Sequence, residues 1–537
     1  MKKIGALFLA IILILSVNFY AAASDDESSP LILDLGSLEA LDMIPSVEVE
    51  SDYVINGKEF VIDNIVYEVI KCDKNKGDFE VQVGTGWDGE GLECNENSFT
   101  WNLNIPDSVY YEGNKYKVVS ISKGAFKNRH IFTVNIGDNV RTIGAEAFKN
   151  CTFINELNFG GRVESIGEMA FKGCLSLKEV KMPRLLKSIG KGSFKDCKGL
   201  EEVTMLGSLK VLSSCTFQGC KNLEKVNFVA RFEIVEETCK DLKKSSFVDR
   251  LEIIEDHVFE GCESLNKMKM PKSLIAIGDS SFKNCLNLKS ITLSSKTRCI
   301  RDHAFENCSE LEKIEIPRSV VDIGKESFQN CKKLENVVLN KGIKFIEDSA
   351  FEYCEKLNII NIPSSVECIG ESVFSGCRNL EKIEVDNNNL FYASKNGVLF
   401  NKFETKLIKF PERSLLEEYV VPNTVEIIGR EAFLNCDLKS IKISDTTKII
   451  EKDAFVCSTI EAINLGNGLE RIEKRGFANV YSLKFIVIPE SVKYIGDEAF
   501  FNYTNFTNIY VRGKKNASEF KDGIGKRWSG LFPVKYI

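Results

Sequence analysis

The chain has 537 residues and the composition of a folded protein, with 44% hydrophobic and 27% charged residues. Its formal net charge is −7, and the lysines and arginines are spread along the chain, so no basic stripe is available to neutralise the phosphates of a nucleic acid. The same balance provides no cationic surface for an anionic membrane, and the sequence therefore argues against both partners.

Residues 1–23 have the three parts of a secretory signal peptide. Lys2 and Lys3 form a charged start, residues 4–17 form an apolar segment, and three alanines allow cleavage before Ser24. The apolar segment is shorter than the roughly 20 residues that a membrane-spanning helix needs. We therefore expect a secreted or cell-surface protein, with no membrane insertion after the signal is removed. Removal of both lysines changes the net charge from −7 to −9.

Two segments precede the repeats. Residues 24–51 are acidic, contain two prolines and show no sustained period, which indicates a poorly ordered tether. Residues 52–119 contain alternating apolar and polar runs, Phe60–Cys72 and Phe79–Gly86, on either side of a turn-rich segment. A solenoid end exposes its core unless something covers it, so we predict that residues 52–119 form an N-terminal β cap.

A repeat of about 23 residues governs residues 120–511. Each unit has a phenylalanine, a cysteine three positions later, a leucine after six, and apolar residues at nine and eleven. A fixed period in this range is the signature of a solenoid, in which each unit buries its apolar face by stacking on its neighbours. The phenylalanines that mark the repeat are Phe126, Phe148, Phe171, Phe194, Phe217, Phe259, Phe282, Phe305, Phe328, Phe351, Phe374, Phe433, Phe455, Phe477 and Phe500.

Each part of a repeat unit predicts a different local structure. Apolar and polar residues alternate in Leu311–Pro317, which predicts a short strand with one buried face that ends at the proline. Gly324 permits a tight turn. Lys325–Cys331 is expected to form one helical turn that places Phe328 and the cysteine on the same side. The expected fold is therefore an α/β solenoid with a parallel strand ladder.

Two gaps interrupt the series of phenylalanines. In the first gap we predict a degenerate unit near residues 234–258, in which Cys239 takes the phenylalanine position. In the second gap we predict a β-hairpin insertion at residues 386–411, because two apolar runs flank a turn there. After the last repeat, residues 512–537 are expected to form a short C-terminal cap.

The unit Ile316–Val337, IPRSVVDIGKESFQNCKKLENV, resembles the BspA-type leucine-rich repeat, whose units read roughly I-P-x-S-V-x-x-I-G-x-x-A-F-x-x-C-x-x-L-x-x-I. Asn396–Pro411 resembles a variant insert of that family, and Ile509–Ile537 resembles its closing segment, with Arg512 in place of the usual proline. The resemblance implies a surface-exposed or secreted protein of host-associated microbes that adheres to proteins of the host or of neighbouring cells. It supplies no fixed catalytic or binding residues.

Cysteine and histidine are the residues most able to bind a metal. Clustered pairs such as C-x-x-C, which metal sites favour, are absent from the sequence, so we expect a column of buried thiols and neither a metal nor another cofactor. If a disulfide exists, Cys72 with Cys94 in the cap is the first candidate. We expect His257 and His303, two coils apart, to be solvated. The cysteines that share the position three residues after the phenylalanine are Cys151, Cys174, Cys197, Cys220, Cys262, Cys285, Cys308, Cys331, Cys354, Cys377 and Cys436.

The outward face of the predicted strand ladder carries the variable residues. It passes from a mixed acidic start through a lysine-rich middle to an apolar and aromatic end. Clustered aromatic residues on a sheet face are candidates for a partner site, unless the terminal cap covers them. The insertion loop at residues 392–405 is a second candidate. The candidate ligand-binding residues are Phe485, Val487, Tyr510, Val338, Ile359, Lys267, Lys269 and Lys313.

These observations predict a non-enzymatic protein that binds an extracellular protein or glycan surface through its outward strand face. The sequence contains no nucleophile elbow, phosphate loop or zinc helix motif, so catalysis is not expected. Two alternatives stay open, a passive structural component of a cell surface or matrix and a hydrolase of polymers. The oligomeric state is open as well.

Overall fold

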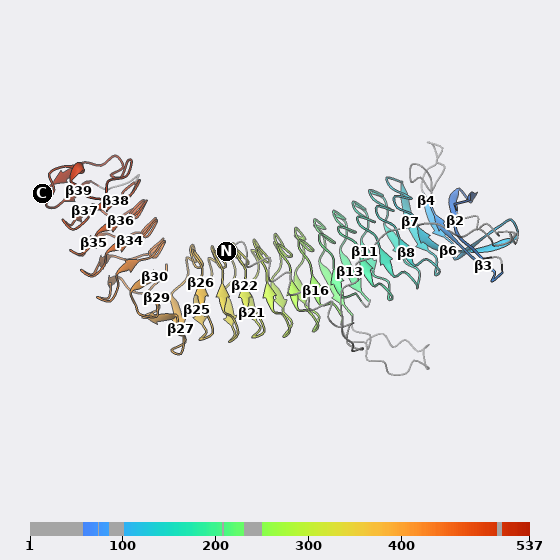
Figure 1. Ribbon diagram of the computed structural model, residues 1–537, viewed down its shortest axis with the longest axis horizontal. Helices are drawn as coiled ribbons and strands as arrows, with labels where there is room; N and C mark the ends of the chain where they lie inside the picture. The colour runs from blue at the N-terminus through green and yellow to red at the C-terminus, as the bar shows by residue number, and fades with distance from the viewer. Residues whose placement is uncertain (1–56, 74, 85–100, 207–208, 230–249, 502–506) are drawn as a thin grey trace, which may run out of the picture. The chain divides into compact units, whose positions relative to one another are not determined.

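The computed structural model describes residues 57–73, 75–84, 101–206, 209–229, 250–501 and 507–537 (Figure 1). The chain divides into two units, residues 1–53 and 54–537, and the description below concerns the second. The predicted signal peptide and tether lie outside the described residues. Among the described residues, no helix is long and apolar enough to span a bilayer.

The solenoid coils stack in chain order, and each contributes one longer strand to a long-strand ladder (Figure 1). Neighbouring long strands lie parallel and are offset by one repeat, so that Lys313 faces Asn336. The long strands are β4 (Trp101–Ile105), β7 (Ile131–Ile136), β9 (Glu156–Asn158), β11 (Glu179–Lys181), β13 (Glu202–Met205), β15 (Lys225–Phe228), β17 (Lys267–Lys269), β19 (Ser290–Thr292), β21 (Lys313–Ile316), β23 (Asn336–Leu339), β25 (Ile359–Ile362), β27 (Lys382–Val385), β31 (Glu418–Val420), β33 (Ser440–Lys442), β35 (Ala462–Asn464), β37 (Phe485–Ile488), β39 (Asn508–Val511) and β40 (Val534–Tyr536).

Each regular coil also contributes a two-residue strand to a second parallel ladder, the short-strand ladder. Together the two ladders confirm the parallel solenoid of about 23-residue units that the sequence predicts. The short strands are β8 (Thr142–Ile143), β10 (Ser165–Ile166), β12 (Ser188–Ile189), β14 (Val211–Leu212), β16 (Ile253–Ile254), β18 (Ala276–Ile277), β20 (Cys299–Ile300), β22 (Asp322–Ile323), β24 (Phe345–Ile346), β26 (Cys368–Ile369), β32 (Ile427–Ile428), β34 (Ile449–Ile450), β36 (Arg471–Ile472) and β38 (Tyr494–Ile495).

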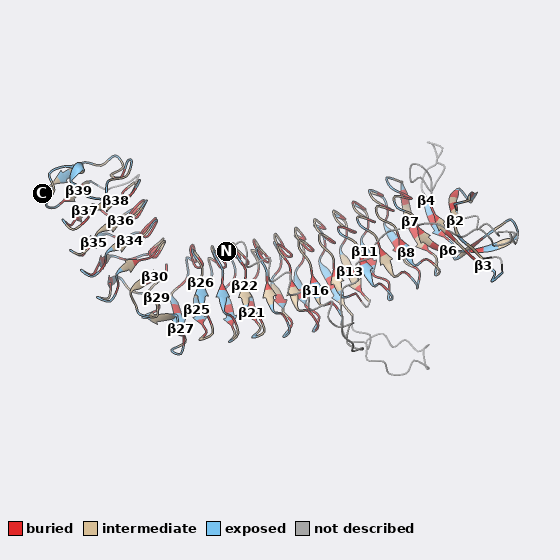
Figure 2. Cartoon of the chain, viewed as in Figure 1, coloured by how far each residue is buried: buried red, intermediate tan, exposed pale blue. Residues whose placement is uncertain are grey.

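The repeated apolar residues fill the space between the two ladders. In β21, Ile314 and Ile316 are buried and Glu315 is exposed, as expected for a strand with one buried face (Figure 2). The phenylalanines form two columns of stacked rings, one from Phe126 to Phe374 and one from Phe410 to Phe500. In the first column, the Phe305 ring lies 5.2 Å from the rings of both Phe282 and Phe328. Because these rings are fully buried, each coil completes the core of the next.

The helical turn predicted at Lys325–Cys331 is wrong. The segment consists of tight turns, and the residues on either side of Phe328 have left-handed backbone conformations, with φ of 54° at Glu326 and 59° at Asn330. Left-handed residues cannot continue a right-handed helix. The backbone N–H of Phe328 donates instead to the carbonyl of Ala350 in the next coil, at 2.8 Å. The turns are therefore stabilised by hydrogen bonds to the neighbouring coil.

The N-terminal segment adds strands to the short-strand ladder. β1 (Glu59–Ile62), β2 (Ile65–Asp73) and β3 (Asp78–Val83) pair in antiparallel fashion, and β3 continues in parallel into β6 (Asn114–Ile121) and then β8. β5 (Ser108–Tyr111) forms a hairpin with β6. β4 pairs with β7, so the long-strand ladder starts inside the segment that the sequence assigned to the cap.

The C-terminal residues 512–537 form one further coil over the end of the stack. They contain a short 3-10 helix, η2 (Ala517–Glu519), and the strand β40, which pairs with β39. Trp528 takes the position of the repeated phenylalanine, with its ring 6.1 Å from that of Phe500. The cap therefore closes the core with the same geometry as a repeat.

Most of the degenerate unit predicted near residues 234–258 lies outside the described residues. β14 pairs directly with β16, and the ring of Phe217 stacks on that of Phe259 at 5.6 Å. The coils on the two sides of the gap are therefore neighbours, and no coil separates them. Residues 250–258 belong to the next regular coil, while Cys239 lies outside the described residues, as does Cys94.

The predicted insertion contains three strands that divide the core in two. β28 (Tyr392–Lys395), β29 (Val398–Asn401) and β30 (Lys406–Lys409) form an antiparallel meander, and β30 then continues the short-strand ladder into β32. β29 is buried on both faces: Leu399 packs in the core that precedes it, and Val398 and Phe400 pack in the core that follows. The insertion is thus a partition between two stacks of coils.

Candidate functional site

On the outward face of the long-strand ladder, the side chains vary from coil to coil. Six of the eight predicted ligand-binding residues are exposed there, and Val487 and Tyr510 are half-buried. The most exposed apolar members are Phe485 at 55%, Val338 at 50% and Ile359 at 42%. Because the inward residues of the same strands are buried, the outward residues contribute little to the core.

The structure brings three predicted residues together at the C-terminal end of this face, and we call them the aromatic end: Phe485, Val487 and Tyr510. Val487 lies opposite Tyr510 across the pair β37–β39, and the rings of Phe485 and Tyr510 meet edge to face at 6.0 Å. The last coil covers this cluster in part, because the Lys535 ammonium lies 5.6 Å from the centre of the Tyr510 ring. Phe485 remains open to solvent.

The other predicted residues do not join the aromatic end. Val338 and Ile359 lie on the adjacent strands β23 and β25, and Lys267, Lys269 and Lys313 lie on β17 and β21. The eight residues therefore occupy two places along the ladder, a continuous stretch from β17 to β25 and the aromatic end.

Sequence reasoning did not identify Val420 or Leu390, two exposed apolar residues near the insertion, whereas Phe403 lies in the loop at residues 392–405 that it named as a second candidate. Val420 points outward from β31 and is 66% exposed. Leu390 and Phe403 are 74% and 80% exposed. The N–H of Lys402 donates to the carbonyl of Phe391, so the pairing of the hairpin brings the chain next to Leu390 close to the chain next to Phe403. Val420 has the same outward position as the residues above, so continuing the repeat across the insertion would have found it.

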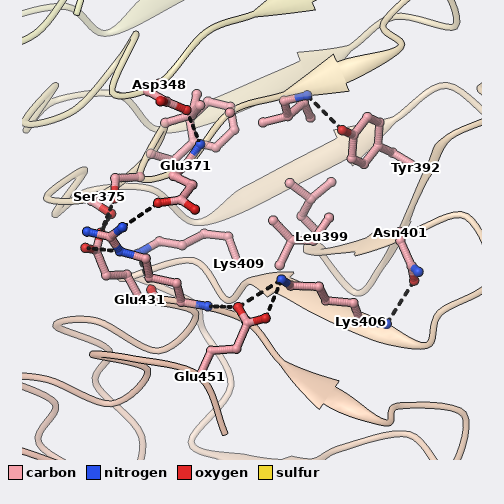
Figure 3. A pocket seen from close by; sticks show the side chains of 18 of the residues that line it. Asp348, Glu371, Ser375, Tyr392, Leu399, Asn401, Lys406, Lys409, Glu431 and Glu451 are labelled. Atoms are coloured by element: carbon pink, nitrogen blue, oxygen red, sulfur yellow. Dashed lines mark hydrogen bonds and ion pairs between the residues drawn. The ribbon is translucent and has the colours of Figure 1, made fainter. Parts of the chain in front are cut away.

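A cavity of about 450 Å³ lies where the insertion separates the two stacks (Figure 3). Its charged groups are paired: Lys406 Nζ lies 2.8 Å from both carboxylate oxygens of Glu451, and Arg430 pairs with Glu371. Burial alone would raise the pKa of Glu431, but hydrogen bonds from two serine hydroxyls lower it below its ordinary value. The lining residues include no histidine or cysteine, and the Glu431 carboxylate already accepts hydrogen bonds from the hydroxyls of Ser372 and Ser375.

One group of side chains has the spacing of a metal site. The ligand atoms of His303, Glu306 and Glu326 all lie within 4.8 Å of one another. However, Lys283 Nζ lies 2.6 Å from Glu306, and Lys325 Nζ lies 3.3 Å from Glu326. The two carboxylates are already neutralised by ammonium groups, so the arrangement is that of an ion-pair network.

The cysteine column is buried, as predicted from its position in the repeat. The thiol of Cys331 donates to the carbonyl of Phe305 in the preceding coil at 3.2 Å, and the same contact recurs along the column. Burial raises the pKa of Cys151 to about 12, so its thiol stays protonated. These cysteines therefore act as small core residues with a weak donor.

Asp322 makes the stability of the solenoid depend on pH. Its Oδ1 atom is buried without a hydrogen-bond partner, and burial, together with Glu347 and Asp302, raises its pKa to about 6. The folded state therefore binds the proton more tightly than the unfolded state, where the pKa is about 3.9. The resulting stability is present below the unfolded value and is lost as the pH rises through about 6.

We expect Asp322→Asn to stabilise the protein by about 1–2 kcal/mol at neutral pH and to change little at about pH 4. Thermal unfolding at both pH values measures the difference. The exposed Glu335→Gln is the matched control for loss of one carboxylate. An equal gain in stability at both pH values would mean that the ionisation of Asp322 is not the cause of the gain.

A family model described as BspA type leucine rich repeat region matches residues 119–239, 235–358, 298–413 and 408–522. No curated protein matches the chain. Among solved structures, a leucine-rich repeat protein from Bacteroides ovatus is 24% identical, with a TM-score of 0.43, over 89% of this chain and 99% of that one.

Two further solved structures are similar over most of their length. The pneumococcal vaccine antigen PcpA is 18% identical, with a TM-score of 0.30, over 90% of this chain and 88% of its own. A leucine rich cell surface protein from Faecalibacterium prausnitzii is 19% identical, with a TM-score of 0.32, over 89% and 94%. Since the family model matches well over half of the chain, and the repeats have the spacing described above, the chain belongs to the BspA-type leucine-rich repeat family.

Proposed function

We propose that this protein is exported and attaches to an extracellular surface through the outward face of its long-strand ladder, without catalysing a reaction. The observation that carries the proposal is the aromatic end, where Phe485 is 55% exposed beside the half-buried Val487 and Tyr510. A soluble protein rarely leaves clustered aromatic side chains in water unless a partner covers them. Aromatic side chains are also the residues that most often anchor protein interfaces.

The repeat architecture supports binding by many weak contacts. Every coil presents outward side chains at the same two positions, about 4.8 Å from those of the next coil. Shallow contacts along such a surface add up when one partner spans several coils. Membership of the family and the predicted signal peptide support an extracellular or surface location.

Changing Phe485, Val487 and Tyr510 together to serine is expected to weaken saturable binding to an extracellular matrix or cell-surface partner by about tenfold or more. The reason is the loss of the apolar anchors at the aromatic end. The measurement is surface binding of the purified chain against a panel of matrix and cell-surface proteins and glycans. Because Tyr510 is half-buried, Phe485→Ser alone is measured as well, and thermal unfolding checks that the variants remain folded.

The matched control removes three exposed leucines from other parts of the coils, Leu175, Leu185 and Leu286. Equal loss of binding in both triple variants would contradict a role for the aromatic end. A passive structural component would instead show self-association of the purified chain and no saturable partner, and a hydrolase would show turnover of a polymer.

A further inference from the structure

The middle of the outward strand face carries lysines without ion-pair partners. We infer that this part of the face binds an acidic polysaccharide, an inference that rests on the proposed binding role of the strand face and assigns it a ligand class. The residues concerned are called the lysine patch and comprise Lys267, Lys269, Ser290, Thr292 and Lys313.

The register of the strands places these side chains in two rows along the solenoid axis. Lys267 lies opposite Ser290, which in turn lies opposite Lys313, and Lys269 lies opposite Thr292. Neighbouring strands are about 4.8 Å apart, so ammonium and hydroxyl groups alternate at the spacing of the coils. All three lysines are exposed. A ligand lying along the axis would therefore meet a cation, a hydroxyl group and a second cation in succession.

The patch is cationic because its lysines are not neutralised by neighbours. No ion pair involves Lys267, Lys269 or Lys313 within the part of the chain that the structure describes, whereas on the acidic coils Lys181 pairs with Glu179 at 3.1 Å. Strands β17 and β19 contain no carboxylate.

Acidic residues limit the extent of the patch. Glu315 lies on β21 beside Lys313, but its carboxylate accepts a hydrogen bond from Asn340, which belongs to the following coil. Glu224 precedes β15 on the other side of the patch. The cationic surface is therefore about two to three coils wide, which suits a short stretch of an extended anionic chain better than a broad polyanionic surface.

The chemistry of the patch favours a glycan over a protein or a nucleic acid. The outward side chains of β17 and β19 are lysine, serine and threonine, so a protein partner would find no apolar or aromatic anchor on these two strands, and the nearest one, Val338, lies beyond the patch on β23. The unpaired bases of a single-stranded nucleic acid would find no aromatic ring on β17 or β19 on which to stack. Hydroxyl side chains can bond to sugar hydroxyls, and ammonium groups form strong charge-assisted bonds to carboxylates or sulfates.

The test is a titration of the purified full chain with three polymers: heparin, which carries sulfates and carboxylates, polygalacturonate, which carries carboxylates alone, and neutral dextran. We expect saturable binding to at least one acidic polymer and none to dextran. Binding should weaken between about 0.05 M and about 0.3 M salt, because salt screens exposed charges. The relative affinity for the two acidic polymers distinguishes sulfate from carboxylate recognition.

The triple variant Lys267→Gln, Lys269→Gln, Lys313→Gln is expected to bind the acidic polymer about tenfold more weakly or worse. The control variant, Lys123→Gln, Lys191→Gln, Lys332→Gln, removes the same charge from exposed lysines in turns outside the strand face and should bind as the native chain does. Equal weakening in both variants, or equally tight binding of poly-glutamate through the same lysines, overturns the inference.

Failure of this inference is distinguishable from failure of the proposed function. If the chain binds no acidic polymer but binds a surface protein through the aromatic end, the polysaccharide inference is refuted and the proposed function stands. If the chain binds neither an acidic polymer nor any protein or glycan of the panel, both the inference and the proposed function are refuted.

Discussion

Replacing Phe305 with alanine is expected to lower the free energy of unfolding by about 3–5 kcal/mol. The ring is fully buried and stacks on Phe282 and Phe328, each at 5.2 Å, so its removal opens a cavity between three coils. Collapse of the neighbouring coils around that cavity is opposed by the backbone hydrogen bonds between them, such as that from Phe305 N–H to the carbonyl of Ser327 at 2.7 Å. Little of the lost packing can therefore be recovered.

The position of Phe305 also predicts how the variant unfolds. In a stack of repeats each coil contacts only its neighbours, so a weak point in the middle of the column lowers the coupling between the two sides. We expect a lower midpoint in urea and a broader transition than for the native chain. The measurement is equilibrium unfolding followed by circular dichroism and by tryptophan fluorescence.

The matched control for this variant is Phe403→Ala. The Phe403 side chain is 80% exposed in the insertion, and its removal should change the stability by no more than about 0.5 kcal/mol. A loss of similar size in both variants would mean that the phenylalanine column does not carry the core. A change below 1 kcal/mol at Phe305 would lead to the same conclusion.

The repeat predicted the fold well because it specifies the same contacts many times. The phenylalanine and cysteine columns are buried as the spacing requires, since each position recurs at equivalent places in stacked coils. The turns around the phenylalanine were harder to predict. The position two residues after it is often Asn, Gly or Asp, which tolerate a left-handed backbone, and this signal was available in the sequence.

The position two residues before the phenylalanine gave no such signal. Glu146, Met169, Glu326 and Arg475 all have positive φ there, although none of these residue types favours that conformation. The conformation is imposed by the neighbouring coil: the N–H of Glu326 donates to the carbonyl of Asp348 at 3.0 Å. A contact between coils therefore outweighs the local preference, which sequence reasoning within one unit cannot reveal.

The exposed residues of the candidate site could be predicted one by one, but which of them lie together in the structure could not. Exposure follows from strand alternation, which identified Phe485 and Val338. Whether the last coil covers the aromatic end depends on where Lys535 lies, and this comes from the pairing of β39 with β40. The gap after Phe217 shows the same limit, because the spacing of the phenylalanines did not reveal that β14 pairs directly with β16.

Replacing Glu412 with alanine is expected to destabilise the protein by about 3–5 kcal/mol. Glu412 and Lys409 are 3% and 5% exposed, and Lys409 Nζ lies 3.2 Å from Glu412 Oε1. The same carboxylate accepts a hydrogen bond from the N–H of Gly376 at 2.7 Å and another from Asn435 at 3.2 Å. The variant leaves a buried ammonium and a buried N–H without their acceptor.

These contacts join the two stacks that the insertion separates. Gly376 belongs to the last regular coil before the insertion, Lys409 ends the last strand of the insertion, β30, and Asn435 belongs to the coil after it. In regular coils the equivalent backbone group donates to a carbonyl of the next coil, as Asn330 does to Glu352 at 2.9 Å. At the junction a side chain replaces that carbonyl, so Glu412 maintains the connection where the repeat itself is interrupted.

Two comparisons make the Glu412 prediction specific. Glu310→Ala breaks the ion pair with Lys333, which has a similar geometry, at 2.7 Å, but is more exposed, and this variant should lose less than about 1 kcal/mol. The double variant Lys409→Met, Glu412→Leu removes both buried charges together, and it should be more stable than Glu412→Ala, because no ion is left unpaired. If the double variant is instead the less stable of the two in urea unfolding, the unpaired buried ammonium of Lys409 is not the reason for the loss.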